Sequence, residues 1–329
     1  MNTTGLPAED PLHAPSPPRL GIGVIGAGRV GAVLGAALRA QGHAITGVYA
    51  VSDASRARAE ELLPGIPVLD VFSIVERSEM LLLAVPDDQL APLASGIAAS
   101  GIVPGGQLVV HTSGAHGVQV LVPLREAGCA TIALHPAMTF TGTAADLPRL
   151  VGCPMGVSAE EHLLTVAAAL VVELEGKAVV IPEGDRPLYH AALAHGANHL
   201  VVLVDQAREV LARIGIDSPG AYLRPLLTAA LEESLARGAA ALTGPARRGD
   251  AGTIGAHLEA FADLDATAIQ GEQGDLVPVY RALARAAVAR AGLSDDSREA
   301  VLAALEDPTP VNESEGGGEA DGGEARESR

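Results

Sequence analysis

The feature that most constrains this 329-residue chain is a glycine-rich turn near its beginning. Gly26, Gly28 and Gly31 follow an apolar run and open an amphipathic segment. In a dinucleotide-binding strand–turn–helix, the first glycine allows the bend, the second lets the backbone approach a pyrophosphate, and the third lets helix and strand pack closely. The helix N-terminus then offers free N–H groups to the phosphates. The pattern predicts cofactor contacts from these glycines, Arg29 and Val30; a turn that serves packing alone is the alternative.

Apolar runs and amphipathic segments alternate through the first half of the chain. Continuous apolar strands joined by helices are typical of a parallel sheet that is covered on both faces. We expect helices at residues 30–41, 55–63, 118–127 and near 160–174. Strands are expected at residues 20–25, 44–51, 80–85, 107–111 and 130–134, with 150–157 and 178–181 extending the sheet.

The pattern changes at residues 182–185, where Pro and Gly interrupt the chain and Asp185 can cap a helix. From Arg186 to about Ile214 the apolar period is helical, and further helices are expected at residues 220–237, 252–264 and 278–291. We therefore expect an α/β fold: a doubly wound domain over residues 20–183, then an all-helical domain over 184–305. The Pro-rich residues 1–19 and the acidic tail 306–329 are expected to be disordered.

The charge balance argues against nucleic acid as a partner. The chain has 22 basic and 40 acidic residues and no Trp, whereas nucleic-acid binding depends on Lys and Arg that neutralise phosphates. No run approaches the roughly 18–20 apolar residues that a membrane span needs, and the first residues lack the signal-peptide pattern. The two cysteines indicate a reducing compartment, so we expect a cytoplasmic protein with no membrane partner.

The choice between NAD and NADP depends on the end of the second strand. A carboxylate there would hold the ribose hydroxyls of NAD. We expect the strand to end at Ser52 and Asp53 to cap the next helix, which leaves Ser52, Ser55 and Arg56 to hold a 2′-phosphate. This arrangement favours NADP(H) over NAD(H); the alternative is that Arg56 and Arg58 are solvated helix residues.

Two further turns follow expected strands, at the edge where open α/β sheets bind ligands. Val85 and Pro86 follow one strand, and Thr112 and Ser113 follow the next. We expect Val85, Pro86 and Thr112 on the nicotinamide side of the cofactor and Ser113 near the substrate. For Thr112 and Ser113 the alternative is to cap the following helix.

Six sequence blocks carry a resemblance that extends over residues 20–295. In these blocks the chain resembles Rossmann-like oxidoreductases whose second domain is a helical domain of unknown function. It is also similar in layout to ketopantoate reductases, pyrroline-5-carboxylate reductases and the 6-phosphogluconate dehydrogenase group. The resemblance implies an NAD(P)-dependent reductase with a 6-phosphogluconate-dehydrogenase-C-terminal-like second domain that forms a homodimer. The blocks are residues 26–31, 84–88, 111–115, 135–140, 189–192 with Asn198, and 243–250 with His257.

One departure from these relatives concerns the general acid. Ketopantoate reductases and hydroxyacid dehydrogenases place a Lys on the first long interdomain helix, with an Asn one turn later. Asn198 fits that Asn, but Ala194 stands where the Lys is expected, and Lys177 is the single lysine of the chain. Any general acid must therefore be another residue.

Histidines are the candidates for that proton donor. His190, Ala194 and Asn198 are spaced by four residues, so they line one side of a helix. His190 is our first choice, and a packed histidine bonded to a backbone carbonyl is the alternative. His135, before Pro136 at a strand end, is the second choice, unless it only fixes the loop that comes after it.

The other histidines are given structural roles. His195 and His199 point away from the line of His190 and are expected in the core or an interface, and His111 is expected to be structural. No cysteine or suitably placed acid completes a ligand set with these histidines, so we expect no metal.

Residues of the second half are candidates for substrate binding. Thr243, Arg248 and Asp250 form a turn rich in hydrogen-bond donors, and His257 follows seven residues later. Arg248 can form a bidentate pair with a substrate carboxylate. The alternative is that it pairs with Asp250 and stabilises the loop.

These features together predict an NADP(H)-dependent reductase of a small carbonyl compound. A 2-oxo acid is favoured, with ketopantoate first, its carbonyl held by Ser113, Asn198 and Arg248 and protonated by His190. An imine reductase resembling pyrroline-5-carboxylate reductase needs less help from a general acid and is an alternative in the same class. Outside that class, the alternatives are a non-catalytic NADP(H) sensor and a scaffold with no cofactor.

Overall fold

The computed structural model describes residues 19–266 and 274–306. The terminal segments expected to be disordered lie outside these residues, apart from Arg19 and Glu306. Contacts between residues divide the chain into two units, Met1–Val201 and Val202–Arg329. The boundary falls inside the long helix α7 (Arg186–Arg213), and each unit is described by itself.

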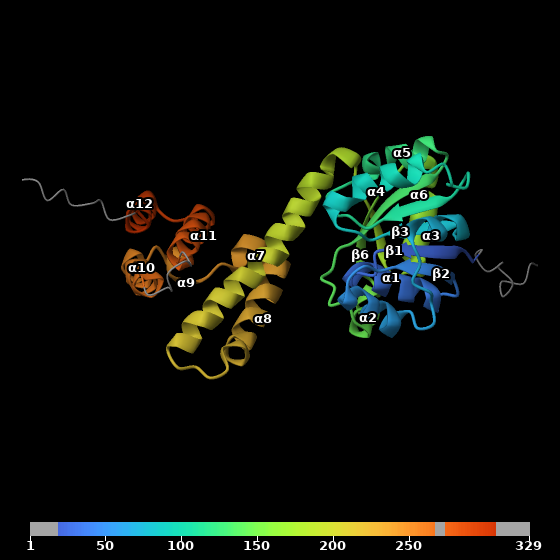
Figure 1. Cartoon of the computed structure of the whole chain (residues 1–329). Helices are drawn as coiled ribbons and strands as arrows, with labels where there is room; N and C mark the ends of the chain where they lie inside the picture. The colour runs from blue at the N-terminus through green and yellow to red at the C-terminus, as the bar shows by residue number, and fades with distance from the viewer. Residues whose placement is uncertain (1–18, 267–273, 307–329) are drawn as a thin grey trace, which may run out of the picture. The chain divides into compact units, whose positions relative to one another are not determined.

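The first unit contains a seven-stranded sheet in the order β2-β1-β3-β4-β5-β6-β7. Figure 1 labels β1, β2, β3 and β6 of this sheet. The expected strands are confirmed, but the sheet is not wholly parallel, because β6 runs antiparallel to β5. The strand ends also differ by a few residues. The strands are β1 (Gly21–Ile25), β2 (Ala44–Tyr49), β3 (Met80–Leu83), β4 (Leu108–His111), β5 (Ala130–Pro136), β6 (Pro154–Ala159) and β7 (Lys177–Val180).

Helices and short turns connect these strands. The segment expected as one helix at 118–127 is instead a 3₁₀ turn followed by a five-residue helix, which begins where Pro123 needs no N–H partner. The strand expected from residue 150 starts at Pro154, because a 3₁₀ segment, η3 (Ala144–Leu150), precedes it. The helices are α1 (Arg29–Ala40), α2 (Asp53–Leu62), α3 (Val71–Arg77), α4 (Asp87–Ala99), α5 (Val122–Glu126) and α6 (Leu164–Glu173); the sequence analysis had not singled out α3 and α4.

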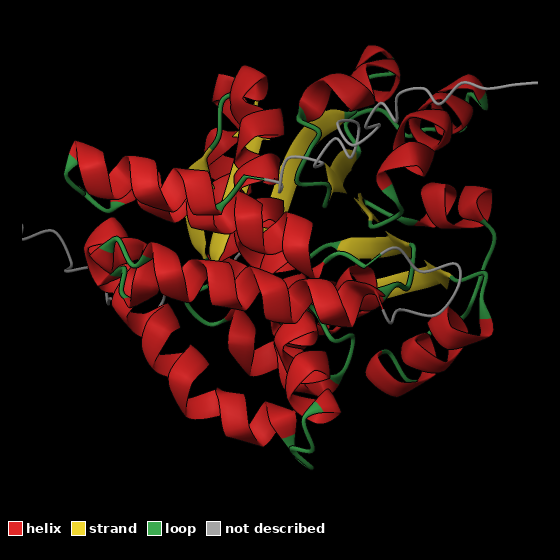
Figure 2. Cartoon of the chain, turned by 90° about the vertical axis from the view of Figure 1, so that its left-hand side faces the viewer, coloured by secondary structure: helices red, strands yellow, loops and turns green. Residues whose placement is uncertain are grey.

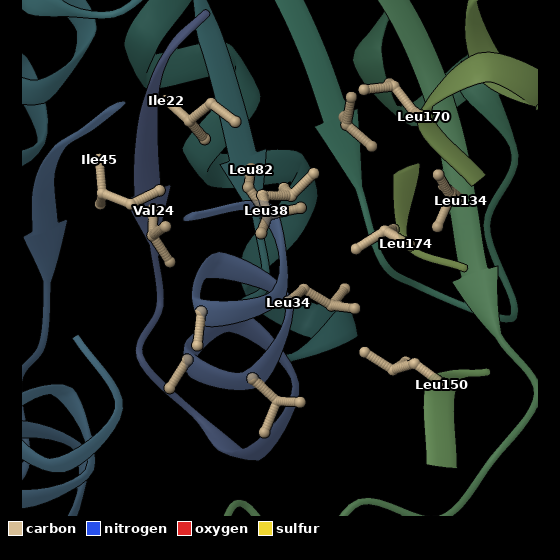
Figure 3. Close-up of a cluster of buried hydrophobic side chains, with 14 of the residues drawn as sticks. Ile22, Val24, Leu34, Leu38, Ile45, Leu82, Leu134, Leu150, Leu170 and Leu174 are labelled. Atoms are coloured by element: carbon tan, nitrogen blue, oxygen red, sulfur yellow. The ribbon is translucent and has the colours of Figure 1, made fainter. Parts of the chain in front are cut away.

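Alternate residues of β1, β3 and β4 enter two different buried clusters. In β1, Val24 packs in the cluster that contains α1 and α6 residues, whereas Ile25 packs with residues of α3, α4 and α5. Figure 3 shows the first cluster, in which Leu34 of α1 and Leu170 of α6 gather against the strand side chains. The helices therefore cover both faces, as a period-two pattern in buried strands requires.

The strand order places a topological switch point between β1 and β3. The chain passes from β1 to β2 on one side and returns to β3 on the other, while Val68 makes a single parallel bridge to Val48 beyond β2. Ligands of open α/β sheets bind at the carboxyl ends of the strands beside such a point. The turn from Gly26 to Gly28 lies there, directly after β1.

Two glycines of this turn are required by close packing. Gly26 has a φ of +103°, and a Cβ on it would lie 2.5 Å from the Ala84 carbonyl oxygen. A Cβ on Gly31 would collide with the Gly26 carbonyl oxygen and lie 2.8 Å from the Ala84 Cβ. The strand–turn–helix predicted from the sequence is confirmed, with both glycines in the packing roles assigned to them.

The described residues of the second unit form helices and no strand (Figure 2). Ile254, Val288 and Val301 belong to its buried core. The expected helices are confirmed, and a further helix capped by Ser294 comes after them. The helices are the remainder of α7, α8 (Pro219–Arg237), α9 (Gly244–Arg248), α10 (Ala251–Ala266), α11 (Leu276–Arg290) and α12 (Asp295–Ala304).

Across the described part of the chain, no helix combines the length and the apolar character that crossing a membrane requires.

We predict that Gly31→Ala lowers the free energy of unfolding by about 1–3 kcal/mol, because the added methyl group overpacks the contact between α1 and the turn. Gly96→Ala is the matched control. Gly96 is exposed within α4, and a Cβ added to it would meet nothing within 4 Å, so this change should stabilise the protein by about 0.5–1 kcal/mol. Urea denaturation followed by circular dichroism measures both, and equal effects would contradict the close packing.

Candidate functional site

A cavity of about 330 Å³ lies at the carboxyl ends of β1, β3, β4 and β5, within the first unit. It brings together the glycine turn, the turns after β3 and β4, and two histidines. The residues that line it are Gly28, Arg29, Val30, Ala84, Val85, Pro86, Asp87, Thr112, Ser113, Gly114, His135, Pro136, Met138, Phe140 and His190.

The N-terminus of α1 forms one wall of this cavity. Gly28 caps the helix without a side-chain hydrogen bond, and the first turn carries no acidic residue. A Cβ on Gly28 would meet nothing within 4 Å, so the glycine leaves open space where a side chain would stand. Free N–H groups, the positive end of the helix dipole and the cationic Arg29 together fit a phosphate group.

The end of β2 differs from the expectation in two ways. The strand ends at Tyr49 rather than at Ser52. Ser52 is the N-cap of α2, because its Oγ accepts from the Ser55 backbone N–H at 3.1 Å. Asp53 is therefore the first helical residue and not the cap, and its carboxylate stands in solvent.

The arginines of α2 have different surroundings. Arg56 lies 3.5 Å from Asp53 in an exposed pair. Arg58 is half-buried and reaches back to the glycine turn, where its guanidinium donates to the Ala27 carbonyl at 3.4 Å. Neither Ser52 nor Arg56 belongs to the cavity wall, so Arg58 is the α2 cation that touches the turn.

His111 fixes the turn after β4. The ring is fully buried, with Nε2 2.9 Å from the Gly117 carbonyl oxygen and Nδ1 3.2 Å from the Ser113 backbone N. Nε2 must donate and Nδ1 must accept, so the ring is neutral. Burial lowers the pKa of His111 to about 4. These two bonds confirm the structural role expected for His111. In the same turn, Ser113 Oγ accepts from the His116 N–H at 3.1 Å.

Two histidines also line the cavity, and a tyrosine contacts one of them. His135, at the end of β5, has its Nδ1 3.0 Å from the Tyr189 hydroxyl of α7. The rings of His135 and His190 are nearly perpendicular, with centroids 6.3 Å apart. A Cβ on Gly114 would lie 2.8 Å from His190 Cδ2 and 3.0 Å from His135 Nε2. The missing side chain at this glycine lets both rings reach the cavity.

Arg186 lies fully buried at the start of α7 and joins the elements behind this wall. Its Nε donates to Ser158 Oγ at 2.8 Å, and its terminal nitrogens donate to the carbonyls of Gly156 at 3.0 Å, Ala133 at 3.2 Å and Ser113 at 3.4 Å. Burial lowers the pKa of Arg186. The group remains charged, because the ordinary pKa of a guanidinium is very high. From the sequence, Arg186 is expected only as the start of a helix.

This charge acts on the nearby histidine. Burial first, and then the charges of Arg186 and His190, lower the pKa of His135 to about 4, while Asp87 acts in the opposite direction. His135 is therefore neutral near pH 7. Asp87 lies in the first turn of α4 on the cavity wall and had been missed because its sequence context indicated only a turn.

A second hollow, of about 450 Å³, shares His135, Met138 and His190 with the first cavity. It continues along one face of α7 through Ala194 and Asn198, as the four-residue spacing predicted. His195 and His199 do not line it. Both are exposed in the single chain, and their Nδ1 atoms lie 2.9 Å apart. They are therefore not core residues, and the interface position expected as the alternative stays a prediction.

Arg149 is a cationic side chain on this second hollow that the sequence analysis missed. Its guanidinium lies 3.3 Å from Asp146 Oδ1 and 3.5 Å from the Thr139 carbonyl, and half of the side chain is exposed. Asp146 is fully buried and also accepts from the N–H groups of Thr141 and Gly142. The buried carboxylate therefore holds Arg149 beside the hollow.

The substrate-binding candidates of the second half belong to the second unit. Asp250 accepts from Thr253 N at 3.0 Å and Thr253 Oγ1 at 2.7 Å, so its carboxylate caps α10. These bonds, more than the charge of Arg248, lower the pKa of Asp250. His257 Nδ1 lies 2.8 Å from the Tyr280 hydroxyl, and Thr243 and Arg248 are exposed.

Within the residues that the structure describes, no three His, Cys, Asp or Glu side chains gather as a metal site would require.

The glycine turn, the open helix N-terminus and the cavity at the switch point define the class: an α/β protein with a dinucleotide-binding type of site. Family models agree with this assignment. Residues 7–136 match a Rossmann-like domain, and residues 153–287 match a domain of unknown function, DUF2520. The chain therefore combines a Rossmann-like domain with a DUF2520 domain. No curated protein sequence matches it.

Solved structures share the fold at low sequence identity. A Bacteroides fragilis protein provisionally named an NADP oxidoreductase is 21% identical, with a TM-score of 0.67 over 82% of this chain and 98% of that one. A Thermotoga maritima protein is 19% identical, with a TM-score of 0.57 over the same shares. An imine reductase from Myxococcus stipitatus, in complex with NADP+, is 20% identical, with a TM-score of 0.53 over 86% and 94%.

We predict that acid destabilises the protein between the folded pKa of His111, about 4, and its ordinary value of 6.5. In that window the unfolded chain binds more protons, so the free energy of unfolding falls by about 1.4 kcal/mol per pH unit for each such histidine. His111→Gln keeps a donor for Gly117 and should reduce the slope by one histidine's share. Urea titrations at several pH values measure the slope.

The control for this experiment is His162→Gln, since the His162 side chain is 71% exposed. It should leave the slope unchanged. An equal slope in the wild type and the His111 variant would show that His111 is not held neutral by the fold.

Proposed function

We propose that the protein is an NADP(H)-dependent reductase of a small carbonyl compound. The observation that carries the proposal is that a single cavity has the open N-terminus of α1, at Gly28, on one wall and His135 and His190 on the other. A reductase needs these two parts together: a place for the dinucleotide phosphates and proton-bearing groups beside the reacting carbon.

NADP(H) is favoured over NAD(H) by the residues after β2. The strand ends at Tyr49, and the next residues, through Ser52, provide no carboxylate for ribose hydroxyls. Asp53 points to solvent, whereas Arg58 stands against the glycine turn and Arg56 lies nearby on α2. Val85, Pro86 and Thr112 would face the nicotinamide, and the bound cofactor would supply the hydride.

His190 is our candidate for the proton donor. It lines both hollows, and within the described chain its ring has no hydrogen-bond partner that would occupy it. Asn198 continues the same face of α7, and the Ser113 hydroxyl can donate because its oxygen accepts from the backbone. These polar groups would hold the oxygen of a carbonyl as charge develops on it.

A 2-oxo acid suits the second hollow, and ketopantoate remains the first compound to test. Arg149 offers a guanidinium on the same hollow as His190 and Asn198, which can pair with a carboxylate. In the second unit, Arg248, with Thr243 and His257 nearby in sequence, keeps its proposed contribution to substrate binding.

A second candidate function is the reduction of a cyclic imine. The specific observation in its favour is Ala194, which lines the hollow at the position where carbonyl reductases of similar layout carry a lysine. An imine is more basic than a ketone and needs less help from a general acid. A non-catalytic NADP(H) sensor explains the cofactor wall but gives no reason for the histidine pair.

We predict NADPH oxidation when the purified protein is given one member of a panel of 2-oxo acids and cyclic imines, with NADH slower. His190→Ala should lower kcat by about 100-fold or more, as loss of a general acid does, and should leave the dissociation constant of NADPH unchanged. His195→Ala, on the exposed side of α7, is the matched control and should turn over normally.

The panel also tests the role of Arg149. Arg149→Gln should raise KM for an acidic substrate by about tenfold and leave a neutral aldehyde unaffected, while Arg125→Gln serves as the control for an exposed ion pair. Tight NADPH binding with no turnover across the panel would contradict the reductase and favour the sensor.

We further propose a cytoplasmic homodimer formed through the helices. Large apolar side chains of α7 and α8 stand in solvent in the single chain: Val201 is 68% exposed, Leu226 67% and Leu235 80%. Exposed apolar surface of this kind is typical of a protein interface. Cys129 and Cys153 are both free and buried, which fits a reducing compartment.

We predict a solution mass of twice the chain mass of 33.3 kDa by sedimentation equilibrium. Leu226→Glu with Leu235→Glu should shift the mass towards one chain, because a buried unpaired carboxylate opposes association. Leu302→Glu, on α12, is the control. A wild-type protein that sediments as a single chain at high concentration would contradict the dimer.

A further inference from the structure

His135 presents its two ring nitrogens to different surroundings. Nδ1 lies 3.0 Å from the Tyr189 hydroxyl, behind the cavity wall. Nε2 lies beside Gly114, where an added Cβ would be only 3.0 Å away. Gly114 and His135 both line the cavity, so Nε2 is the nitrogen on the side where a substrate can bind.

We assign the Tyr189 phenol as the donor in its hydrogen bond with His135. Burial raises the pKa of Tyr189 above its ordinary value, so the phenol keeps its proton in the neutral range. Within the described chain, His135 Nδ1 is the hydrogen-bond partner of the Tyr189 hydroxyl.

Gly156 makes this approach possible. A Cβ at this position would lie 2.8 Å from the Tyr189 hydroxyl oxygen and 2.9 Å from Cζ. Because Gly156 on β6 has no side chain, the phenol can reach His135, which lies opposite Gly156 on the neighbouring strand β5. Arg186 lies against the Tyr189 ring, with Cζ 5.8 Å from the ring centroid.

Burial, and then the charges of nearby groups, keep the His135 ring neutral. Arg186 and His190 oppose a positive charge on it, Asp87 favours one, and burial is the largest effect. A neutral imidazole carries a single N–H. Because Nδ1 accepts from Tyr189, that hydrogen is on Nε2.

We propose that Tyr189 is a positioning residue that holds His135 as the Nε2–H tautomer, so that His135 donates a hydrogen bond from Nε2 into the cavity, to the oxygen or nitrogen of the substrate double bond. The second part rests on the proposed reductase function. His135 polarises the double bond and keeps its own proton. The proton that ends on the product comes from His190. His135 therefore polarises the double bond, and His190 protonates it.

The tautomer can be measured without a substrate. Nitrogen-15 NMR of the full chain, labelled at histidine and assigned by comparison with His135→Gln, distinguishes protonated from unprotonated ring nitrogens. We expect a protonated Nε2, an unprotonated Nδ1 and no titration of His135 near its ordinary value of 6.5. Tyr189→Phe keeps the ring against Arg186 but removes the hydroxyl, and the two His135 nitrogens should move towards an average of both tautomers.

The second unit offers a matched control. His257 Nδ1 lies 2.8 Å from the Tyr280 hydroxyl, with ring centroids 5.7 Å apart, as in the pair of His135 and Tyr189. Tyr280→Phe should change the His257 signals and leave those of His135 as they were. A protonated Nδ1 on His135 in the wild type, or unchanged His135 signals in Tyr189→Phe, would overturn the proposal.

Turnover separates this inference from the proposed function. Tyr189→Phe should lower kcat by about 3- to 10-fold, the effect of one weakened hydrogen bond, with NADPH affinity unchanged. His135→Gln, which retains an N–H donor, should keep more activity than His135→Leu. Turnover by a protein whose His135 carries its proton on Nδ1 would contradict this inference but support the reductase function. A proton on Nε2 without any turnover would contradict the reductase function but support the positioning of His135 by Tyr189.

Discussion

A buried guanidinium holds together the part of the molecule that matters for chemistry. Arg186 donates to a side chain or carbonyls of β5, β6 and the turn after β4. The carboxylate of Glu183 favours the charged form of Arg186, and its oxygens accept from the N–H groups of Val118 and Gln119. Burying a charged group costs free energy unless its hydrogen-bond donors find acceptors. Four acceptors receive the N–H groups of Arg186. The start of α7 is thus fixed to the sheet edge where the histidines stand.

This charge also acts on the residues around it. It disfavours protonation of His135, which already loses solvation by burial, and it lies against the ring of Tyr189. A neutral histidine can donate one hydrogen bond and accept another but cannot act as a strong acid. His190, one residue along α7 from Tyr189, lies beside the His135 ring, but its own ring has no hydrogen-bond partner within the described chain. The two histidines of the cavity therefore have different capacities, although their rings are neighbours.

Glycines create the space in which these groups meet. Gly28 leaves the N-terminus of α1 open, Gly114 lets His135 and His190 approach the cavity, and Gly156 lets Tyr189 approach His135. Only the first of these could be recognised from the sequence, because it belongs to a spaced motif after an apolar strand. Gly114 lies in the turn block 111–115, but its role there, like that of Gly156, depends on side chains that arrive from other elements of the fold.

Local pattern determined much of the fold: the strand–turn–helix at Gly26–Gly31, the alternation that covers both faces of the sheet, and the long helix that carries His190 and Asn198 on one face. These features depend on periods and turn residues within a few positions of one another. Tertiary structure alone decided that β6 runs antiparallel, that Arg149 reaches the hollow of His190, and that Arg186 and Tyr189 stand behind His135. Such relations depend on which strands become neighbours, and no local period in the chain encodes that.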